Sequence, residues 1–274
     1  MDRLELFFSH LALTARVFLT GRLCGTSSDH ASTKCGHLHV VRNGTMKIID
    51  ASGVADVIDE PTILLYPYSE PHTFQSEGAD IVCAFVEFGT SASNPLARAL
   101  PKLLKVPLSA VPELGPVIEL LFTEGFAEKP GRQIAVNRLV EYILVVLLRT
   151  GIEQRLIQDG VLPAFSDLRL SKAVDAIHLE PERQWQLQEL ATVAGMSRAR
   201  FAAHFLGVTG HTPFEYLAQW RISVAQSLLL KGDPLKLVAP YVGYASAGAL
   251  TRAFTQRVGM SPTTWLENQR KAKA

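Results

Sequence analysis

The stretch of sequence that decides the fold is written twice. LQELATVAGMSRARFAAHFLGVTGHTP stands at residues 187–213, and LKLVAPYVGYASAGALTRAFTQRVGMSP stands at residues 235–262. Glycine, serine, phenylalanine and proline recur in the same order, and from the serine onward the copies are offset by 49 residues, so that Phe205 corresponds to Phe254. A repeat this regular indicates two copies of one structural unit rather than a helical bundle with accidental symmetry.

Each copy predicts a short helix, a turn and a second helix. Gly195 and Gly243 stand where the first helix must end, a position that favours positive φ, and Ser197 and Ser246 are suitable N-caps for the second helix. A glycine that ends one helix and a serine that begins the next are typical of a helix-turn-helix.

A long helix is predicted between the two copies. Thr212 and Glu215 have the spacing of a capping box, and Pro213 suits the first helical position. We expect this helix to stop near Gly232.

The second helix of each unit has one apolar stripe and one face of small or cationic residues. Phe201 and Phe205 in the first unit, and Leu250 and Phe254 in the second, form the buried stripes. The opposite faces suit entry into the major groove of DNA, because bulky acids there would be repelled by phosphate. The predicted DNA-binding residues are Arg198, Ala199, Arg200, Ala202, Ala203, Gly248, Thr251, Arg252 and Thr255.

The chemistry of these two faces differs. The alanines of the first helix can contact thymine methyl groups, whereas Arg198 and Arg200 lie on its flanks, nearer phosphate. Arg252 stands at the centre of the second face, where it can bind guanine with two hydrogen bonds or, alternatively, hold only phosphate.

The whole stretch resembles the DNA-binding domain of the AraC/XylS family of transcription regulators. The resemblance covers residues 187–266 and rests on Leu190, Ala191, Gly195, Met196, Ser197, Phe205, Gly210, Thr212, Pro213, Tyr216, Val242, Gly243, Tyr244, Ser246, Phe254, Gly259, Ser261 and Pro262. It departs at Ala203, where the family often has arginine or another polar residue. The resemblance implies an all-α domain of two helix-turn-helix units, with double-stranded DNA and RNA polymerase as partners and activation as the commoner mode.

Charge is divided unevenly along the chain. From Leu168 onward there are 13 Lys and Arg against 7 Asp and Glu, whereas the preceding residues have 14 against 19. This asymmetry is typical of a nucleic-acid-binding module joined to a module that does not bind nucleic acid. No apolar run is long enough to span a membrane and no signal-peptide pattern precedes the first elements, so the sequence predicts a cytoplasmic protein.

The N-terminal part predicts a β-rich domain. Residues 1–20 have apolar spacing that predicts a short amphipathic helix. After them, β-prone runs at His37–Val41, Met46–Ile49, Ile63–Tyr66 and Ile81–Phe88 are separated by turn signals such as Asn43-Gly44. These runs indicate an all-β sandwich or barrel.

This region resembles a cupin, a small β-barrel often found before AraC-type DNA-binding domains. The resemblance rests on His39, Val40, Val41, Gly44, on Pro61 to Pro67, and on Pro71 and His72. Enzymatic cupins have two histidines, a glutamate and a later histidine. This pattern is only partly present, because Arg42 and Asn43 stand at the positions where the glutamate is expected.

Three histidines are candidate metal ligands. His37 and His39 alternate along one strand and so share a face, and His72 can reach them from another strand. Three imidazoles suit zinc, copper, iron or nickel. The alternative is that one histidine packs in the barrel and the others are solvated.

Cys24, Cys35 and Cys83 are candidate redox sensors. Their odd number excludes a disulfide scaffold. Cys24 and Cys83 match positions where the cupin-bearing subgroup often has cysteine, and some of its members respond to reactive chlorine or other oxidants. Lys34 would lower the pKa of Cys35 if the side chains approach, whereas Cys83 in its apolar run is alternatively a buried hydrophobe.

Helices are predicted after the β domain, at Pro116–Phe126 and Arg132–Arg149. The second is apolar over more than half its circumference and needs cover on two sides. We expect it to form a homodimer contact through positions such as Ile143, and helices after the cupin commonly form the dimer contact in the resembled family.

The fold class predicted overall is α+β with two domains. Residues 1–155 form a cupin-like β-barrel with flanking dimerisation helices, residues 156–167 a linker, and residues 168–274 an all-α domain of two helix-turn-helix units. The predicted function is sequence-specific regulation of transcription in response to a small molecule, metal or oxidant, with no required cofactor and no catalysis. The alternative is a cupin metalloenzyme fused to a DNA-binding domain. A DNA-repair protein with an AraC-like module is a third hypothesis, which the sequence does not favour because it shows no other repair motif.

Overall fold

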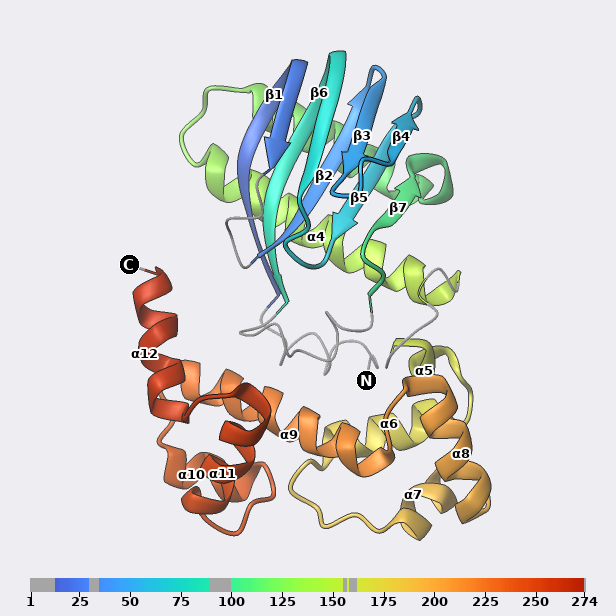
Figure 1. Cartoon of the computed structure of the whole chain (residues 1–274), viewed down its shortest axis with the longest axis vertical. Helices are drawn as coiled ribbons and strands as arrows, with labels where there is room; N and C mark the ends of the chain where they lie inside the picture. The colour runs from blue at the N-terminus through green and yellow to red at the C-terminus, as the bar shows by residue number, and fades with distance from the viewer. Residues whose placement is uncertain (1–12, 30–34, 89–99, 155–156, 158–161, 274) are drawn as a thin grey trace. The chain divides into compact units, whose positions relative to one another are not determined.

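In the computed structural model the described residues are 13–29, 35–88, 100–154, 157 and 162–273 (Figure 1). The chain divides into two compact units, one made of Leu13–Glu87 and Leu100–Leu156 and the other containing Ile157–Ala274. No helix of the described residues is long and apolar enough to cross a membrane. The order expected from the sequence, a β domain followed by an all-α domain, is confirmed.

The first unit is built on one curled antiparallel sheet. Its strands are β1 (Leu13–Asp29), β2 (Gly36–Asn43), β3 (Met46–Asp50), β4 (Ala55–Ile58), β5 (Thr62–Tyr66), β6 (His72–Phe88) and β7 (Leu104–Pro107). They lie in the order β4-β3-β6-β2-β5-β7, and β1 pairs with β6. The four β-prone runs of the sequence lie within β2, β3, β5 and β6, which confirms them as strands.

The long strand β6 pairs with two different neighbours. Its first residues pair with β3, from Ser76 opposite Met46 to His72 opposite Asp50. Its later residues pair with β2, from Asp80 opposite Asn43 to Val86. One strand therefore changes its neighbour part-way along. Gly78, with φ 143°, lies at the change.

The prediction of a helix over residues 1–20 is wrong where the structure describes it. Residues from Leu13 onward belong to β1, and those before it lie outside the described residues. The backbone of β1 is hydrogen-bonded by side chains of helix α4 (Arg132–Glu153): Asn137 accepts from the Val17 N–H at 2.9 Å, and Gln133 donates to the Val17 carbonyl at 2.8 Å. These contacts satisfy strand groups that would otherwise be open, and the local spacing gave no sign of them.

Two helices follow the sheet, α3 (Gly115–Phe126) and α4 (Arg132–Glu153), after the short 3-10 turns η1 (Leu108–Ala110) and η2 (Pro112–Leu114). Arg42 of β2 ties α3 to the sheet, because it pairs with Asp80 at 2.9 Å and Glu119 at 3.2 Å and lies over the Phe122 ring.

The apolar circumference of α4 is covered inside this unit, by β1 and α3. Ile143, which the sequence offered as a dimer position, is fully buried, as are Leu144 and Leu147. A dimer contact through Ile143 is therefore excluded. The apolar side chains of α4 that remain exposed are Ile134 and Tyr142.

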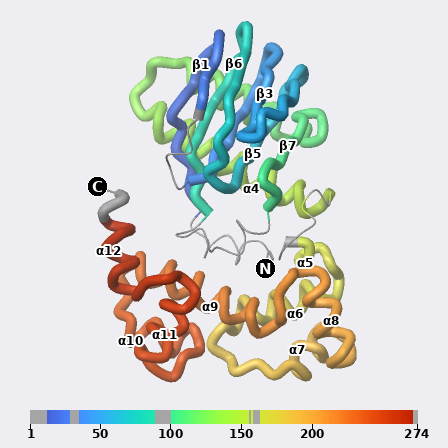
Figure 2. The backbone as a smooth tube through the Cα atoms, viewed as in Figure 1, coloured from blue at the N-terminus to red at the C-terminus, as the bar shows by residue number. Residues whose placement is uncertain are grey.

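The second unit is all helical. Its helices are α5 (Leu162–Ser166), α6 (Leu170–Leu179), α7 (Leu187–Val193), α8 (Arg198–Thr209), α9 (Pro213–Leu230), α10 (Leu235–Tyr241), α11 (Ala247–Val258) and α12 (Pro262–Lys273). Figure 2 shows α9 running between the group formed by α6, α7 and α8 and the group formed by α10, α11 and α12. Helix α5 lies within the segment expected to be a linker and packs against α6 and α8.

The punctuation of the repeat is confirmed. Gly195 and Gly243 have φ of 63° and 80°, so each short helix ends in the left-handed region that favours glycine. Helix α9 begins with the predicted capping box, in which Thr212 accepts from the Glu215 N–H and Glu215 accepts from the Thr212 N–H.

Candidate DNA-binding surface and histidine cluster

Helix α8 is the second helix of the first helix-turn-helix. Phe201 and Phe205 are fully buried and hold α8 on the domain core. Four of its five predicted DNA-binding residues are exposed and Ala202 is half-buried, so the face is available as expected. The exposed set is Arg198, Ala199, Arg200 and Ala203.

Helix α11 is the corresponding helix of the second helix-turn-helix. The buried Leu250 and Phe254 hold it on the domain core. Of its predicted residues, Gly248, Arg252 and Thr255 are exposed and Thr251 is half-buried.

The two threonine hydroxyl groups on this face donate hydrogen bonds within α11. Thr251 donates to the Ala247 carbonyl and Thr255 donates to the Thr251 carbonyl, both at 2.8 Å. Arg252 is a long, exposed side chain on this face. Within the described part of the chain it has no carboxylate at ion-pair distance.

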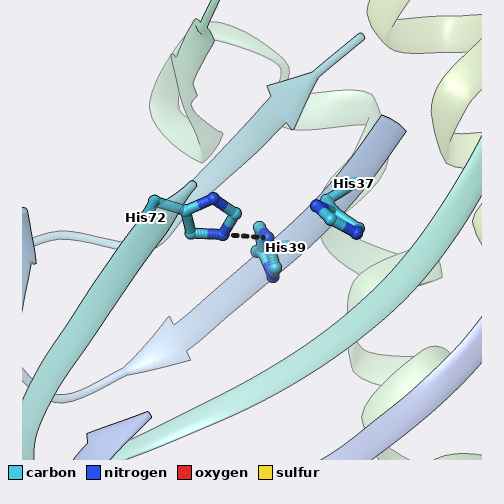
Figure 3. A group of neighbouring side chains, drawn as sticks. All are labelled: His37, His39 and His72. Atoms are coloured by element: carbon cyan, nitrogen blue, oxygen red, sulfur yellow. Dashed lines mark hydrogen bonds between the residues drawn. The ribbon is translucent and has the colours of Figure 1, made fainter. Parts of the chain in front are cut away.

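The three histidines come together in the sheet unit. His37 and His39 project from β2, and His72 reaches them from the start of β6 (Figure 3). Their candidate ligand nitrogens all lie within 4.8 Å of one another, and the Nε2 atoms of His39 and His72 are 3.0 Å apart. All three side chains are buried. The alternative of solvated histidines is therefore wrong.

The surroundings of the cluster favour a neutral His39 and orient the ring of His72. Burial, then the neighbouring His72 and His37, lower the pKa of His39 well below its usual value. His72 is hydrogen-bonded through Nδ1 to the Glu70 carbonyl at 2.8 Å and stacks on the Tyr66 ring at 4.2 Å. A neutral imidazole with one nitrogen fixed by a carbonyl is the form that binds metal ions.

The donor atoms of the three histidines suit a metal ion. It offers three nitrogen donors from two strands, and the buried Nδ1 of His39 has no hydrogen-bond partner among the described residues. A buried polar atom left in this state is costly unless a ligand satisfies it. In donor type and proximity the histidines fit zinc, copper, iron or nickel.

A cavity of about 160 Å³ adjoins the cluster. His39 and Cys83 line it from opposite positions on β2 and β6, since the two residues are paired in the sheet register. The rest of its wall is mainly apolar and includes Phe18, Phe74 and Phe85. A space of this size holds a molecule about as large as benzene.

The three cysteines lie in different environments. Cys24 is exposed, and Cys83 is buried at 3% exposure in the cavity wall. Lys34 lies outside the described residues, so its expected effect on the pKa of Cys35 stays a prediction. Burial, together with Glu87, whose Oε1 lies 3.5 Å from the thiol, raises the pKa of Cys35 to about 11.

The sequence did not single out Tyr66 or Phe74, which enclose His72. Phe74 carried a usable signal, because it follows His72 by two residues in a strand and so shares its face. The stacking of Tyr66 arises from the pairing of β2 with β5, which places Tyr66 opposite His37.

Comparison with known proteins gives both units a class. Residues 2–153 match the family described as Cupin, and residues 190–268 match the family described as Helix-turn-helix domain. The chain is thus a cupin unit joined to a helix-turn-helix unit.

Several curated relatives share this class. AlkR, an HTH-type transcriptional regulator of Acinetobacter baylyi, is 30% identical over 86% of this chain and 78% of its own length. RclR, an RCS-specific transcriptional activator of Escherichia coli, is 25% identical over 85% of this chain and 84% of its own length. A putative AraC-like transcription regulator of Streptomyces lividans is 30% identical over 69% of this chain. The chain belongs to the cupin-bearing, AraC-like family of transcription regulators.

The coverage of other relatives is smaller. The chain spans 57% of the length of an HTH-type transcriptional regulator of Haemophilus influenzae and 63% of the Streptomyces lividans relative. A solved structure of ToxT from Vibrio cholerae, with an unsaturated fatty acid bound, covers 93% of this chain at 16% identity and a TM-score of 0.42. The curated relatives named above are transcription regulators, and none of them supports the metalloenzyme alternative.

Proposed function

We propose that this chain is a sequence-specific DNA-binding regulator of transcription, an activator in the commoner mode of its family. The observation that carries the proposal is the pair of outward-facing helices α8 and α11, both small or cationic on the exposed face. Arg198 and Arg200 on α8 and Arg252 on α11 have no carboxylate at ion-pair distance within the described ranges. Exposed arginines that are not neutralised by the protein itself are suited to phosphate and base edges.

The two helices divide the work of recognition. Phosphate contacts from Arg198 and Arg200 supply affinity that depends on salt and not on sequence. The alanines of α8 fit thymine methyl groups and groove shape, and Arg252 of α11 reads guanine. Helix α9 holds the two units so that they enter successive major grooves on one side of the duplex.

The cupin unit is the proposed sensor, and its first candidate ligand is a transition metal held by His37, His39 and His72. When bound, such an ion would supply a Lewis-acidic centre beside the cavity. The chain itself supplies three buried imidazoles, the Glu70 carbonyl that orients His72, and apolar walls that exclude water. The small-molecule or oxidant effector expected from the sequence would occupy the cavity that His39 and Cys83 line.

A homodimer through the exposed side of α4 is proposed in place of the buried Ile143 side. Ile134, Arg138 and Tyr142 recur every four residues, so they form one stripe on the helix. We also propose RNA polymerase as a partner and the cytoplasm as the location. The first domain is proposed to end at residue 155, and the DNA-binding unit to begin with α5 instead of at residue 168.

Selection of bound fragments from the source genome by the full chain tests the DNA-binding proposal. We expect enrichment of a site with two boxes separated by about one helical turn, 10 to 10.5 base pairs. Equal retention of all fragments at moderate salt would contradict sequence-specific binding.

Metal analysis of protein purified without chelators, followed by cobalt(II) titration, tests the metal proposal. We expect about one ion per chain and visible absorption from the bound cobalt. A His39→Ala, His72→Ala variant should lose both, whereas His211→Ala, in the helical unit, should lose neither. Absence of metal and of a cobalt spectrum in the wild type would exclude the ion as the signal.

A further inference from the structure

Arg221 lies in the middle of α9, the helix that connects the two helix-turn-helix units. Its side chain turns toward the loop between α6 and α7, at residues 180–186. Its Nε donates to the Pro181 carbonyl at 2.6 Å, and its Nη2 donates to the Arg183 carbonyl at 2.8 Å. A single guanidinium therefore binds two carbonyls of the loop that leads into the first helix-turn-helix. The rigid fork of arginine suits this arrangement, whereas the single ammonium of lysine does not.

The Arg221 side chain also lies against the second helix-turn-helix. A Cβ atom added to Gly243, in the turn between α10 and α11, would be 2.6 Å from Nη2 of Arg221. The Tyr244 ring lies 5.8 Å from the guanidinium carbon. The turn of the second helix-turn-helix thus packs directly on the arginine that binds the loop of the first.

A separate hydrogen bond joins the loop and the turn without α9. Nε2 of Gln184 donates to the Gly243 carbonyl at 3.0 Å. The added Cβ at Gly243 would also lie 2.9 Å from Cα of Glu182. Gly243 is required twice here, for its φ of 80° and for this close approach of two backbones.

The loop that makes these contacts is itself held in shape. Arg183 pairs with Glu180 and Glu189, both at 3.0 Å, and its guanidinium lies 4.0 Å from the centre of the Trp185 ring. Trp185 is buried and donates to the Glu180 carbonyl. Because Glu189 also accepts from the N–H of Gln186 at the start of α7, the loop is fixed to the first helix-turn-helix.

We propose that Arg221, Gln184 and Gly243 form a clasp that fixes the separation and rotation of α8 relative to α11, and so sets the spacing between the two DNA boxes that the protein accepts. This inference rests on the proposed DNA-binding function. Without the clasp, α9 would connect the two helix-turn-helix units without these added contacts. Twisting at the ends of α9 would then let the recognition helices adapt to other spacings. Arg221 is a positioning residue, since it acts through the placement of α8 and α11.

The first test measures the geometry without DNA. Spin labels on unnatural amino acids at Gly207 and Gln256, both exposed, report the distance between α8 and α11 in the full chain with its cysteines intact. We expect one narrow distance distribution in the wild type and broad distributions in Arg221→Lys and Gln184→Ala. Lys231→Gln, an exposed cation just after α9, is the matched control and should leave the distribution narrow. Narrow distributions in both clasp variants would overturn the proposal.

The second test measures spacing on DNA. One base pair inserted between the boxes of the selected operator turns the second box by about 35° and moves it about 3.4 Å. We expect the wild type and Lys231→Gln to bind this operator about tenfold or more weakly, a penalty of roughly 1.4 kcal/mol. Arg221→Lys and Gln184→Ala should lose most of this difference between the two operators.

The outcomes separate the two proposals. An unchanged spacing preference in both variants overturns the clasp as the determinant of spacing. If the wild type shows no specific site at all, the DNA-binding function fails, while the distance measurement still decides whether the clasp holds the helices. Gln184 is exposed, so its variant keeps the test valid if Arg221→Lys does not fold.

Discussion

Oδ2 of Asp167 lies 2.7 Å from Nε2 of His204, so a residue three positions before the start of α6 is paired with the recognition helix α8. The other carboxylate oxygen of Asp167 accepts from the backbone N–H groups of Arg169 and Leu170, both at 2.9 Å. One side chain thus begins α6 and contacts α8. The place where the chain enters the DNA-binding unit is coupled directly to the helix that meets DNA.

Replacement of Asp167 by Asn is expected to destabilise the helical unit at neutral pH. Partial burial opposes ionisation, but the N–H groups of Leu170 and Arg169 and the side chain of His204 outweigh it and lower the pKa of Asp167. The amide oxygen of asparagine can still accept from these N–H groups, so the loss is that of the negative charge at the start of α6, about 0.3 to 1 kcal/mol. The half-exposed pair with His204 adds less, because exposed ion pairs are screened by solvent.

The pH dependence follows from the direction of this shift. Since the carboxylate is favoured in the folded state, its stabilisation is present above the unfolded-state pKa of about 3.9 and is lost as the pH falls through the lower folded-state pKa. Urea unfolding of the wild type and of Asp167→Asn should therefore differ at pH 7 and converge below about pH 3.9. Asp233→Asn, an exposed acid in the loop after α9, is the control and should match the wild type. A difference that persists undiminished in acid would refute this account.

Ile134→Glu with Tyr142→Glu is expected to convert the proposed dimer into a monomer that stays folded. Both side chains are exposed, at 69% and 53%, so the charges enter solvent in the monomer but an apolar contact in the dimer. Sedimentation at micromolar concentration measures the change. A wild type that is already monomeric there, or a variant that stays dimeric, would rule out this face.

Ile143→Glu gives the contrasting result. Its side chain is fully buried in the core of the sheet unit, so an unpaired carboxylate there should unfold the unit instead of separating subunits. Circular dichroism distinguishes this loss of structure from simple dissociation.

The cysteines are expected to react with iodoacetamide in the order Cys24, Cys35, Cys83. Cys24 is exposed, whereas Cys35 has a pKa of about 11. At pH 8 only about one thousandth of the Cys35 side chain is then the reactive thiolate. Cys83 is 3% exposed and should react only on unfolding.

Peptide mass spectrometry over time checks this order. Glu87→Gln removes a group that raises the pKa of Cys35, and should speed its alkylation several-fold. Glu60→Gln, elsewhere in the same unit, should not. Modification of Cys35 as fast as Cys24 in the wild type would show that the thiol is not protected in this way.

The parts of this fold that depend on local sequence were predictable. Alternation placed His37 and His39 on one face of a strand, and the glycine and serine punctuation fixed both helix-turn-helix units. The capping box at Thr212 and Glu215 predicted where α9 begins.

The remaining features depend on residues far apart in the sequence. Cys35 and Glu87 are 52 positions apart and meet only because β2 pairs with β6. The local spacing predicts a helix where β1 lies, since the backbone of this strand is hydrogen-bonded by side chains of α4 more than a hundred residues later. The same packing hides Ile143. Neither contact has a local signal.

Arg252→Ala is expected to relax the preference of the protein at one base pair of its operator. Arg252 stands exposed at the centre of the α11 face, with Gly248 one turn earlier leaving room for close approach. The neighbouring Thr251 and Thr255 have committed their hydroxyl protons to helix carbonyls, so Arg252 is the donor on this face best placed for guanine O6 and N7. Loss of such a paired contact removes about 1 to 3 kcal/mol of discrimination.

Arg200→Ala is the matched comparison on the other recognition helix. Since Arg200 lies on the flank of α8, its loss should weaken binding to all sequences alike and make the salt dependence shallower by about one unit of log–log slope. Binding to a set of single-base operator variants at two salt concentrations distinguishes the roles. If Arg252→Ala instead loses the same affinity on every variant, Arg252 holds phosphate and guanine is read elsewhere. The alanines of α8 would then carry readout by shape and thymine methyl contact alone.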